Sequence, residues 1–150
     1  MARIERSIEI DAPPERVFET LAHWEGLTRW STITDSHRGP ETCTRVGDEF
    51  EQTIRVAGIG LETQWKVTRY EPPSTIAYRV TGPGDSHMLM SQTVTPAASG
   101  SRLELDIDYD LPGGVLGDVV DRLYVERRNE READHTLQNL KDYLEDRAGA

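Results

Sequence analysis

The chain opens on residues whose hydrophobic and polar side chains alternate with a period of two. Isoleucines at positions 4, 8 and 10 fall on one face, and acidic or hydroxyl side chains occupy the positions between them. This alternation is typical of a strand with one buried face. We therefore predict a β-strand over residues 3–10.

Two short helices are predicted after this strand. Asp11 can accept a hydrogen bond from an unpaired first-turn amide, and Pro13 and Pro14 suit a helix start because no donor is needed there. Apolar residues then recur at helical spacing up to Leu21. The segment 24–30 predicts a second short helix, and its terminal tryptophans are expected to fill one end of the core.

Residues 33–111 keep the two-residue period, interrupted by Gly, Pro, Asp and Ser about every ten residues. This pattern predicts consecutive antiparallel strands and excludes helices. The strand predicted at 103–110 alternates Leu, Leu, Ile and Tyr with four acidic residues, so we expect a strip of carboxylates on its outer face.

From residue 115 to about 147 the apolar positions shift to helical spacing. A helix of this length is roughly 45 Å long and must cross the whole sheet. The predicted fold class is therefore α+β: a curved antiparallel sheet of about seven strands wrapped around a long C-terminal helix, with two short helices after the first strand.

Length and charge narrow the class of protein. We expect one domain over residues 1–150. The net charge of -10 repels phosphate backbones and anionic membranes, so nucleic acid is not the expected partner. Cys43 is the single cysteine, which excludes a disulfide framework. Without a signal-like or membrane-spanning apolar run, we expect a cytoplasmic protein with no membrane span.

Several segments resemble the START-like (SRPBCC) superfamily of helix-grip proteins, in its polyketide cyclase/dehydrase and lipid-transport branch. The resembling segments are IEIDAPPERVF at 8–18, Trp30, VGD at 46–48, YEPP at 70–73 and LQNLK at 137–141. The resemblance spans nearly the whole chain. It implies a deep, largely apolar cavity between the sheet and the long helix, which members use for lipids, quinones, polyketides and other hydrophobic molecules. The resemblance carries over no catalytic residue.

The chain shows no motif for a metal or a cofactor. Its four histidines lack paired ligand spacing, and neither a nucleophile elbow nor a phosphate loop is present. We therefore expect no metal and no cofactor. His87 is expected to point away from the cavity if its strand is regular.

Polar residues within the apolar series are the main candidates for ligand contact, because a buried polar group needs a partner and can orient a ligand. Gln52 and Thr63 fall in phase with inward residues, and so do Arg69 and Arg6. For each arginine the alternative is a side chain that reaches solvent and pairs with a surface acid.

The aromatic residues and methionines in inward phase either form a ligand pocket or fill the core. With them, the predicted ligand-binding residues are Trp30, Phe50, Gln52, Ile54, Thr63, Trp65, Arg69, Tyr78, Met88, Met90, Tyr109, Leu116, Val120, Leu123 and Arg127.

The sequence leaves three functions open. The first is binding of a hydrophobic or amphipathic small molecule, such as a lipid, quinone or polyketide, without chemistry. The alternative is an aromatase/cyclase-like or dehydratase-like enzyme, in which Arg69 stabilises an enolate and Tyr78 or Tyr109 acts as acid or base. A third is an assembly or stress factor that works through protein contacts made by its acidic face. A homodimer also remains open.

Overall fold

The computed structural model describes residues 2–112 and 121–148, with side chains to residue 146. Seven strands form one antiparallel sheet in the order β1-β7-β6-β5-β4-β3-β2. Their bounds are β1 Ala2–Ile10, β2 Thr34–Arg38, β3 Glu49–Val56, β4 Ile59–Glu71, β5 Thr75–Thr81, β6 His87–Ala97 and β7 Gly100–Asp110. The predicted α+β fold class is confirmed.

Three helices and a 3-10 turn lie where helices are predicted: α1 Pro14–Ala22, η1 Trp24–Gly26, α2 Leu27–Trp30 and α3 Arg122–Ala148. A second 3-10 turn, η2 Pro83–Asp85, falls within residues 33–111, where strands alone are predicted. The start predicted for the last helix, at residue 115, falls within 113–120, outside the described residues.

The predicted helix cap at Asp11 is wrong. Pro13 occupies the N-cap of α1 with extended backbone angles, and no side chain caps this end of the helix. Asp11 lies two residues earlier, and its backbone amide donates to Glu145 Oε2 at 2.9 Å. Pro14 opens the helix as expected, because a first-turn residue needs no amide donor.

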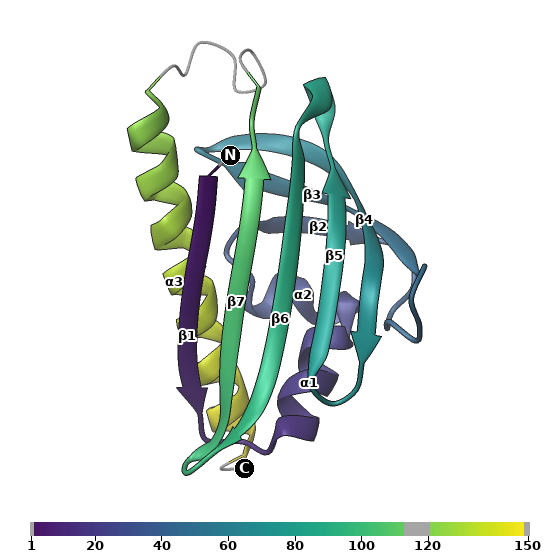
Figure 1. Cartoon of the computed structure of the whole chain (residues 1–150), viewed down its shortest axis with the longest axis vertical. Coiled ribbons are helices and arrows are strands. Elements are labelled where there is room, and N and C mark those ends of the chain that lie inside the picture. Colours follow the sequence, from purple (N-terminus) through teal and green to yellow (C-terminus); the bar gives the residue numbers. More distant parts are fainter. Residues whose placement is uncertain (1, 113–120, 149–150) are drawn as a thin grey trace.

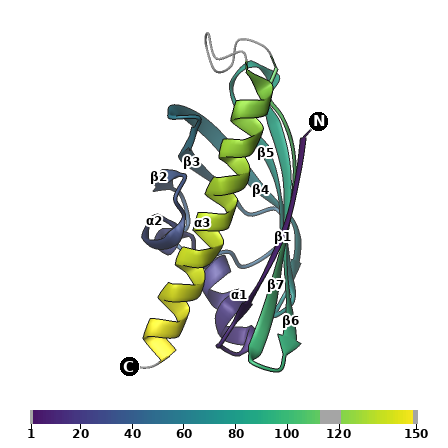
Figure 2. The ribbon, with the colours of Figure 1, turned by 90° about the vertical axis from the view of Figure 1, so that its left-hand side faces the viewer.

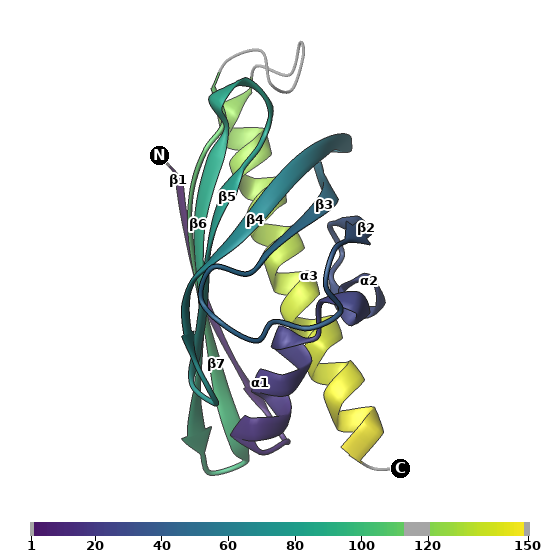
Figure 3. The same ribbon diagram turned by 90° about the vertical axis from the view of Figure 1, so that its right-hand side faces the viewer.

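The sheet curls around α3 (Figure 1), and α3 crosses its concave face obliquely (Figure 2). Figure 3 shows α1 and α2 on the same side of the sheet as α3. The helix turns a row of apolar residues toward the sheet: Val125, Ala133, Leu137, Leu140 and Leu144 are all buried. These three helices thus cover a single face of the sheet.

Arg6 fastens β1 to α3. Its Nε donates to Asp134 Oδ1 at 2.8 Å, and its Nη2 lies 3.3 Å from Glu130 Oε2. The guanidinium therefore pairs with two acids on the helix and does not face the cavity, so the structure supports the surface ion pair as the role of this arginine.

A β-bulge in β4 changes the phase of the inward residues. Val67 pairs with Tyr78 and Arg69 pairs with Ala77, so Thr68 is the extra residue in the ladder. Thr68 and Arg69 are consecutive exposed residues, and the inward series resumes at Tyr70, which packs on Phe18. The regular alternation that predicted an inward Arg69 does not hold here.

The β6–β7 hairpin packs tightly against the start of α1. Gly100 has φ +137, and a Cβ built on it would lie 2.7 Å from backbone atoms of Ala12. The hydroxyl of the next residue, Ser101, donates to the Ala12 carbonyl at 2.6 Å. This close approach requires glycine at position 100.

Cys43 is buried, and burial raises the pKa of its thiol to about 11, as suits a small hydrophobe. Within residues 2–112 and 121–148, no helix is both long and apolar enough to cross a membrane.

Candidate functional site

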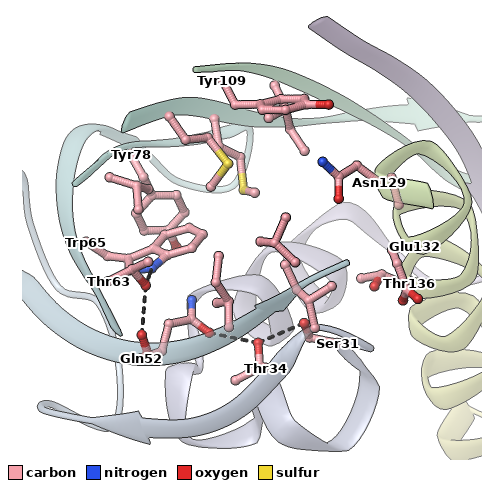
Figure 4. A pocket seen from close by; sticks show the side chains of 18 of the residues that line it. Ser31, Thr34, Gln52, Thr63, Trp65, Tyr78, Tyr109, Asn129, Glu132 and Thr136 are labelled. Atoms are coloured by element: carbon pink, nitrogen blue, oxygen red, sulfur yellow. Dashed lines mark hydrogen bonds between the residues drawn. The ribbon is translucent and has the colours of Figure 1, made fainter. Parts of the chain in front are cut away.

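A cavity of about 160 Å³ lies between the concave face of the sheet and α3. Most of its wall is apolar or aromatic, and Figure 4 shows the polar side chains spaced around it. Ten of the predicted residues line it: Trp30, Phe50, Gln52, Ile54, Thr63, Trp65, Tyr78, Met88, Met90 and Tyr109. The alternating pattern therefore identified most of the strand-borne wall.

Packed aromatic rings form one side of the cavity. Phe50 stacks on Trp65 with ring centroids 5.5 Å apart, and Tyr78 meets Trp65 edge-on at 5.3 Å. Trp24 supports Phe50 from behind at 4.3 Å. Tilted and edge-on contacts of this kind favour one arrangement of the rings.

Tyr78 is poorly placed to act as an acid or base. Its hydroxyl accepts a hydrogen bond of 2.9 Å from Trp24 Nε1, beneath the wall. Complete burial raises its pKa far above the ordinary value, because the phenolate would be desolvated. The phenol therefore stays neutral at physiological pH.

Thr63 is predicted to orient a ligand, but its hydroxyl serves the protein. Its Oγ1 donates to the Gln52 backbone carbonyl at 2.7 Å and accepts from Trp65 Nε1 at 2.8 Å. This bridge joins β3 to β4 and holds the indole in place. We conclude that Thr63 positions Trp65.

Gln52 keeps a free donor. Gln52 is 2% exposed. Its Oε1 accepts a hydrogen bond of 2.8 Å from Thr34 Oγ1, and Thr34 Oγ1 lies 2.8 Å from Ser31 Oγ. These contacts fix the amide so that Nε2 points into the cavity (Figure 4). Nε2 has no hydrogen-bond partner among the described residues.

Tyr109 lies across the cavity from Gln52 (Figure 4). Its hydroxyl is buried and forms no hydrogen bond of standard geometry among the described residues. Burial raises its pKa, and a weak hydrogen-bonding interaction with the Asn129 side chain on α3 partly opposes this rise. The hydroxyl is therefore protonated at neutral pH and available to a ligand.

Three other residues that were predicted to face the cavity do not line it. Arg69 is exposed and forms an ion pair with Glu71 because of the bulge at Thr68. Arg127 is exposed, and Leu123 is 55% exposed, so neither contributes to the cavity wall. Both fall on the outer side of α3. Leu116 and Val120 lie outside the described residues.

His87 lies at the edge of the cavity, at the first position of β6, and is exposed. Its Nδ1 lies 3.2 Å from the Asp85 carbonyl oxygen. The expectation that its side chain points away from the cavity stays a prediction.

Several polar or charged residues of the wall were missed: Ser31, Thr34, Arg55, Ser86, Gln92, Asn129, Glu132 and Thr136. Those on α3 had a detectable signal. Asn129 and Thr136 follow the buried residues Val125 and Ala133 by four and three positions, which places them on or near the same helix face. Ser31, in the α2–β2 connection, had no such signal because an irregular segment has no period, and Thr34 is the first residue of β2, where the alternation is only beginning.

Among the described residues, the charged ones reach the cavity only at its edge. Arg55 has a 57% exposed side chain and pairs with Asp35 at 2.9 Å. Glu132 accepts a hydrogen bond of 2.5 Å from Thr32 Oγ1. In the part of the chain that the structure describes, no group of three or more His, Cys, Asp or Glu could hold a metal ion.

Comparison with known proteins gives a consistent result. A family model described as "Polyketide cyclase / dehydrase and lipid transport" matches residues 1–145. Toxin Rv0910 of Mycobacterium tuberculosis (strain ATCC 25618 / H37Rv) is 30% identical over 127 residues, which cover 80% of this chain and 85% of the relative.

Solved structures share the fold at low sequence identity. Protein CV1439 from Chromobacterium violaceum is 19% identical with a TM-score of 0.72, over 97% of this chain and 99% of that one. TTHA0849 from Thermus thermophilus is 19% identical with a TM-score of 0.75, over 95% and 97% of the two chains.

Proposed function

Because the chain belongs to the polyketide cyclase/dehydrase and lipid transport family, we propose that it binds a hydrophobic or amphipathic small molecule between the sheet and α3, without chemistry. The supporting observation is the cavity itself, which combines apolar and aromatic walls with a few buried polar groups. Such pockets are the usual form of small-molecule sites. Affinity would come from apolar contact area, at about 25 cal/mol per Å².

The expected enzyme mechanism lacks its central residue. Arg69, the proposed enolate stabiliser, is exposed on the far side of the bulge. Tyr78 uses its hydroxyl to accept from Trp24, and burial raises the pKa of both Tyr78 and Tyr109. Neither phenol is suited to act as a base near neutral pH, so binding is the better-supported function.

Native mass spectrometry of protein purified from its own host tests this proposal. We expect a co-purifying small molecule that is released on denaturation. Met90→Trp, which fills the cavity from β6, should abolish the adduct. The matched control is Leu89→Trp, because Leu89 is the adjacent residue and 46% exposed on the opposite face. An empty wild-type protein that also fails to bind apolar probes would contradict the proposal.

A second candidate function comes from the similarity to Toxin Rv0910, which extends over most of both chains. Under this hypothesis the protein slows growth of its host when overproduced. Induced expression of the wild type should then reduce growth. If the cavity is required for this effect, a strain that overproduces Met90→Trp should grow normally. Normal growth of the overproducing strain would rule this candidate out.

A further inference from the structure

We propose that the cavity selects compact, neutral molecules through an oxygen acceptor bound by the Gln52 side-chain amide, and that it rejects carboxylates. This inference rests on the proposed binding function and specifies its ligand class. It combines the free donor of Gln52, the charges around the cavity and the cavity volume.

The Gln52 amide is held in one orientation by the protein. Thr34 Oγ1 donates to Oε1 at 2.8 Å, and the Ser31 hydroxyl stands 2.8 Å behind Thr34. The two amide protons on Nε2 are left to face the cavity. A ligand that supplies an oxygen there gains a hydrogen bond that an apolar ligand cannot make.

The charges around the cavity disfavour an anion. Among the described lining residues, Arg55 is the one arginine, and its side chain is 57% exposed and paired with Asp35. Glu132 adds a negative charge at the edge of the cavity. A carboxylate inside would lose its hydration without gaining a cation, so a neutral ligand is preferred.

Tyr109 offers a second polar contact. Its hydroxyl forms no hydrogen bond of standard geometry among the described residues and lies across the cavity from Gln52. Asn129 on α3 stands beside it. A ligand can therefore be held by polar contacts on two sides and by apolar walls between them.

The volume limits the size of the ligand. A cavity of about 160 Å³ is close to the roughly 150 Å³ engineered cavity that admits benzene. This space fits a single ring with a small substituent. We therefore expect ring-sized ketones, esters or alcohols to bind, and not extended acyl chains.

Three probes of nearly equal shape test this inference: acetophenone, benzoate and cumene. They differ in presenting a neutral acceptor, a charged carboxylate and no acceptor. Binding is measured by calorimetry and by chemical-shift changes in NMR spectra of the full chain. For the wild type we expect acetophenone to bind about tenfold tighter than benzoate and at least threefold tighter than cumene, as one net hydrogen bond would give.

Variants at Gln52 separate the hydrogen bond from the hydrophobic contact. Gln52→Met and Gln52→Leu should bind acetophenone and cumene equally while keeping the affinity for cumene. The matched control is Gln64→Leu, an exposed glutamine on β4 that should behave as the wild type. The wild-type comparison of the three probes requires no variant, so the inference is testable even if both substitutions impair folding.

The outcomes distinguish the inference from the function on which it rests. If benzoate or cumene binds the wild type as tightly as acetophenone, the inference is wrong while binding stands. The same holds if the Gln52 variants keep the preference for acetophenone, or if a co-purifying molecule is found and none of the probes binds. If no molecule co-purifies and no probe binds, both proposals fail.

Discussion

Thr63 is a buried residue in which one hydroxyl satisfies two groups of the protein. It donates to the Gln52 carbonyl and accepts from the Trp65 indole. We expect Thr63→Val, which keeps the shape and removes the hydroxyl, to lower the free energy of unfolding by about 1–3 kcal/mol because two buried polar groups lose their partner. Urea denaturation followed by tryptophan fluorescence measures this change.

The control for Thr63→Val is Thr95→Val, at an exposed position of β6. It should change the free energy of unfolding by no more than about 0.5 kcal/mol. Equal stability of the two variants would show that the Thr63 bridge contributes nothing.

Substitution of Arg69, in contrast, is expected to have little effect. Because it is exposed and paired with Glu71 on its own strand, we expect Arg69→Ala to change ligand affinity less than twofold and stability by less than about 1 kcal/mol. Titration with acetophenone measures the affinity. A tenfold loss of binding would mean that the guanidinium reaches the cavity and would revive the enzyme mechanism.

At the residue scale the sequence predicted a side chain's face where the strand is regular. Gln52 and Trp65 point inward as their alternation required. Arg69 was misplaced because one inserted residue, Thr68, shifts the phase without changing the appearance of the pattern. The adjacent polar pair before Tyr70 was the only trace of the bulge. Which donor of the wall would be free could not be predicted, since it depends on hydrogen bonds between distant residues.

At the scale of elements, the β6–β7 hairpin depends on Gly100. We expect Gly100→Ala to destabilise the protein, by about 1–3 kcal/mol from backbone strain at φ +137 and further from the collision with Ala12. Thermal unfolding by circular dichroism measures the loss.

Gly60→Ala is the matched control for this hairpin. Gly60 lies in another hairpin, its backbone needs no positive φ, and its nearest contact to a built Cβ is 3.7 Å. It should unfold within a few degrees of the wild type. If both variants unfold at the same temperature, the close approach at Gly100 is not a constraint.

The order and type of the elements could be predicted because each has one buried face. Period two marked the strands and helical spacing marked α3. The cap of α1 could not be placed in the same way, because Asp11 and Pro13 both suit a helix start and only the geometry shows that Pro13 occupies the N-cap. Local propensity left two solutions, and the Asp11 amide pairs instead with Glu145 of the distant helix.

At the scale of the whole molecule, two carboxylates make the free energy of unfolding depend on pH. Hydrogen bonds from Thr44 lower the pKa of Asp48, and hydrogen bonds from Lys141 and the Asp11 amide lower the pKa of Glu145. A lowered folded-state pKa gives stability that is present above the unfolded pKa, near 4, and is lost as pH falls through the folded value. We expect the free energy of unfolding to fall as the pH drops below about 4.

The double variant Asp48→Asn with Glu145→Gln tests this link. Its free energy of unfolding should depend less on pH between about 5 and 2 than that of the wild type, as measured by urea denaturation at each pH. Glu19→Gln, at an exposed position of α1, serves as the control and should keep the full dependence. Parallel curves for the double variant and the wild type would contradict the assignment.

The cavity also limits how stable this protein can become. At about 24 cal/mol per Å³, leaving 160 Å³ unfilled forgoes up to about 4 kcal/mol, a large share of the roughly 5–15 kcal/mol that holds a typical domain together. Selection for heat resistance alone would therefore favour larger side chains at Met90 and its neighbours. It would yield a more stable protein that no longer binds a ligand. Keeping the cavity is a trade-off between stability and ligand binding.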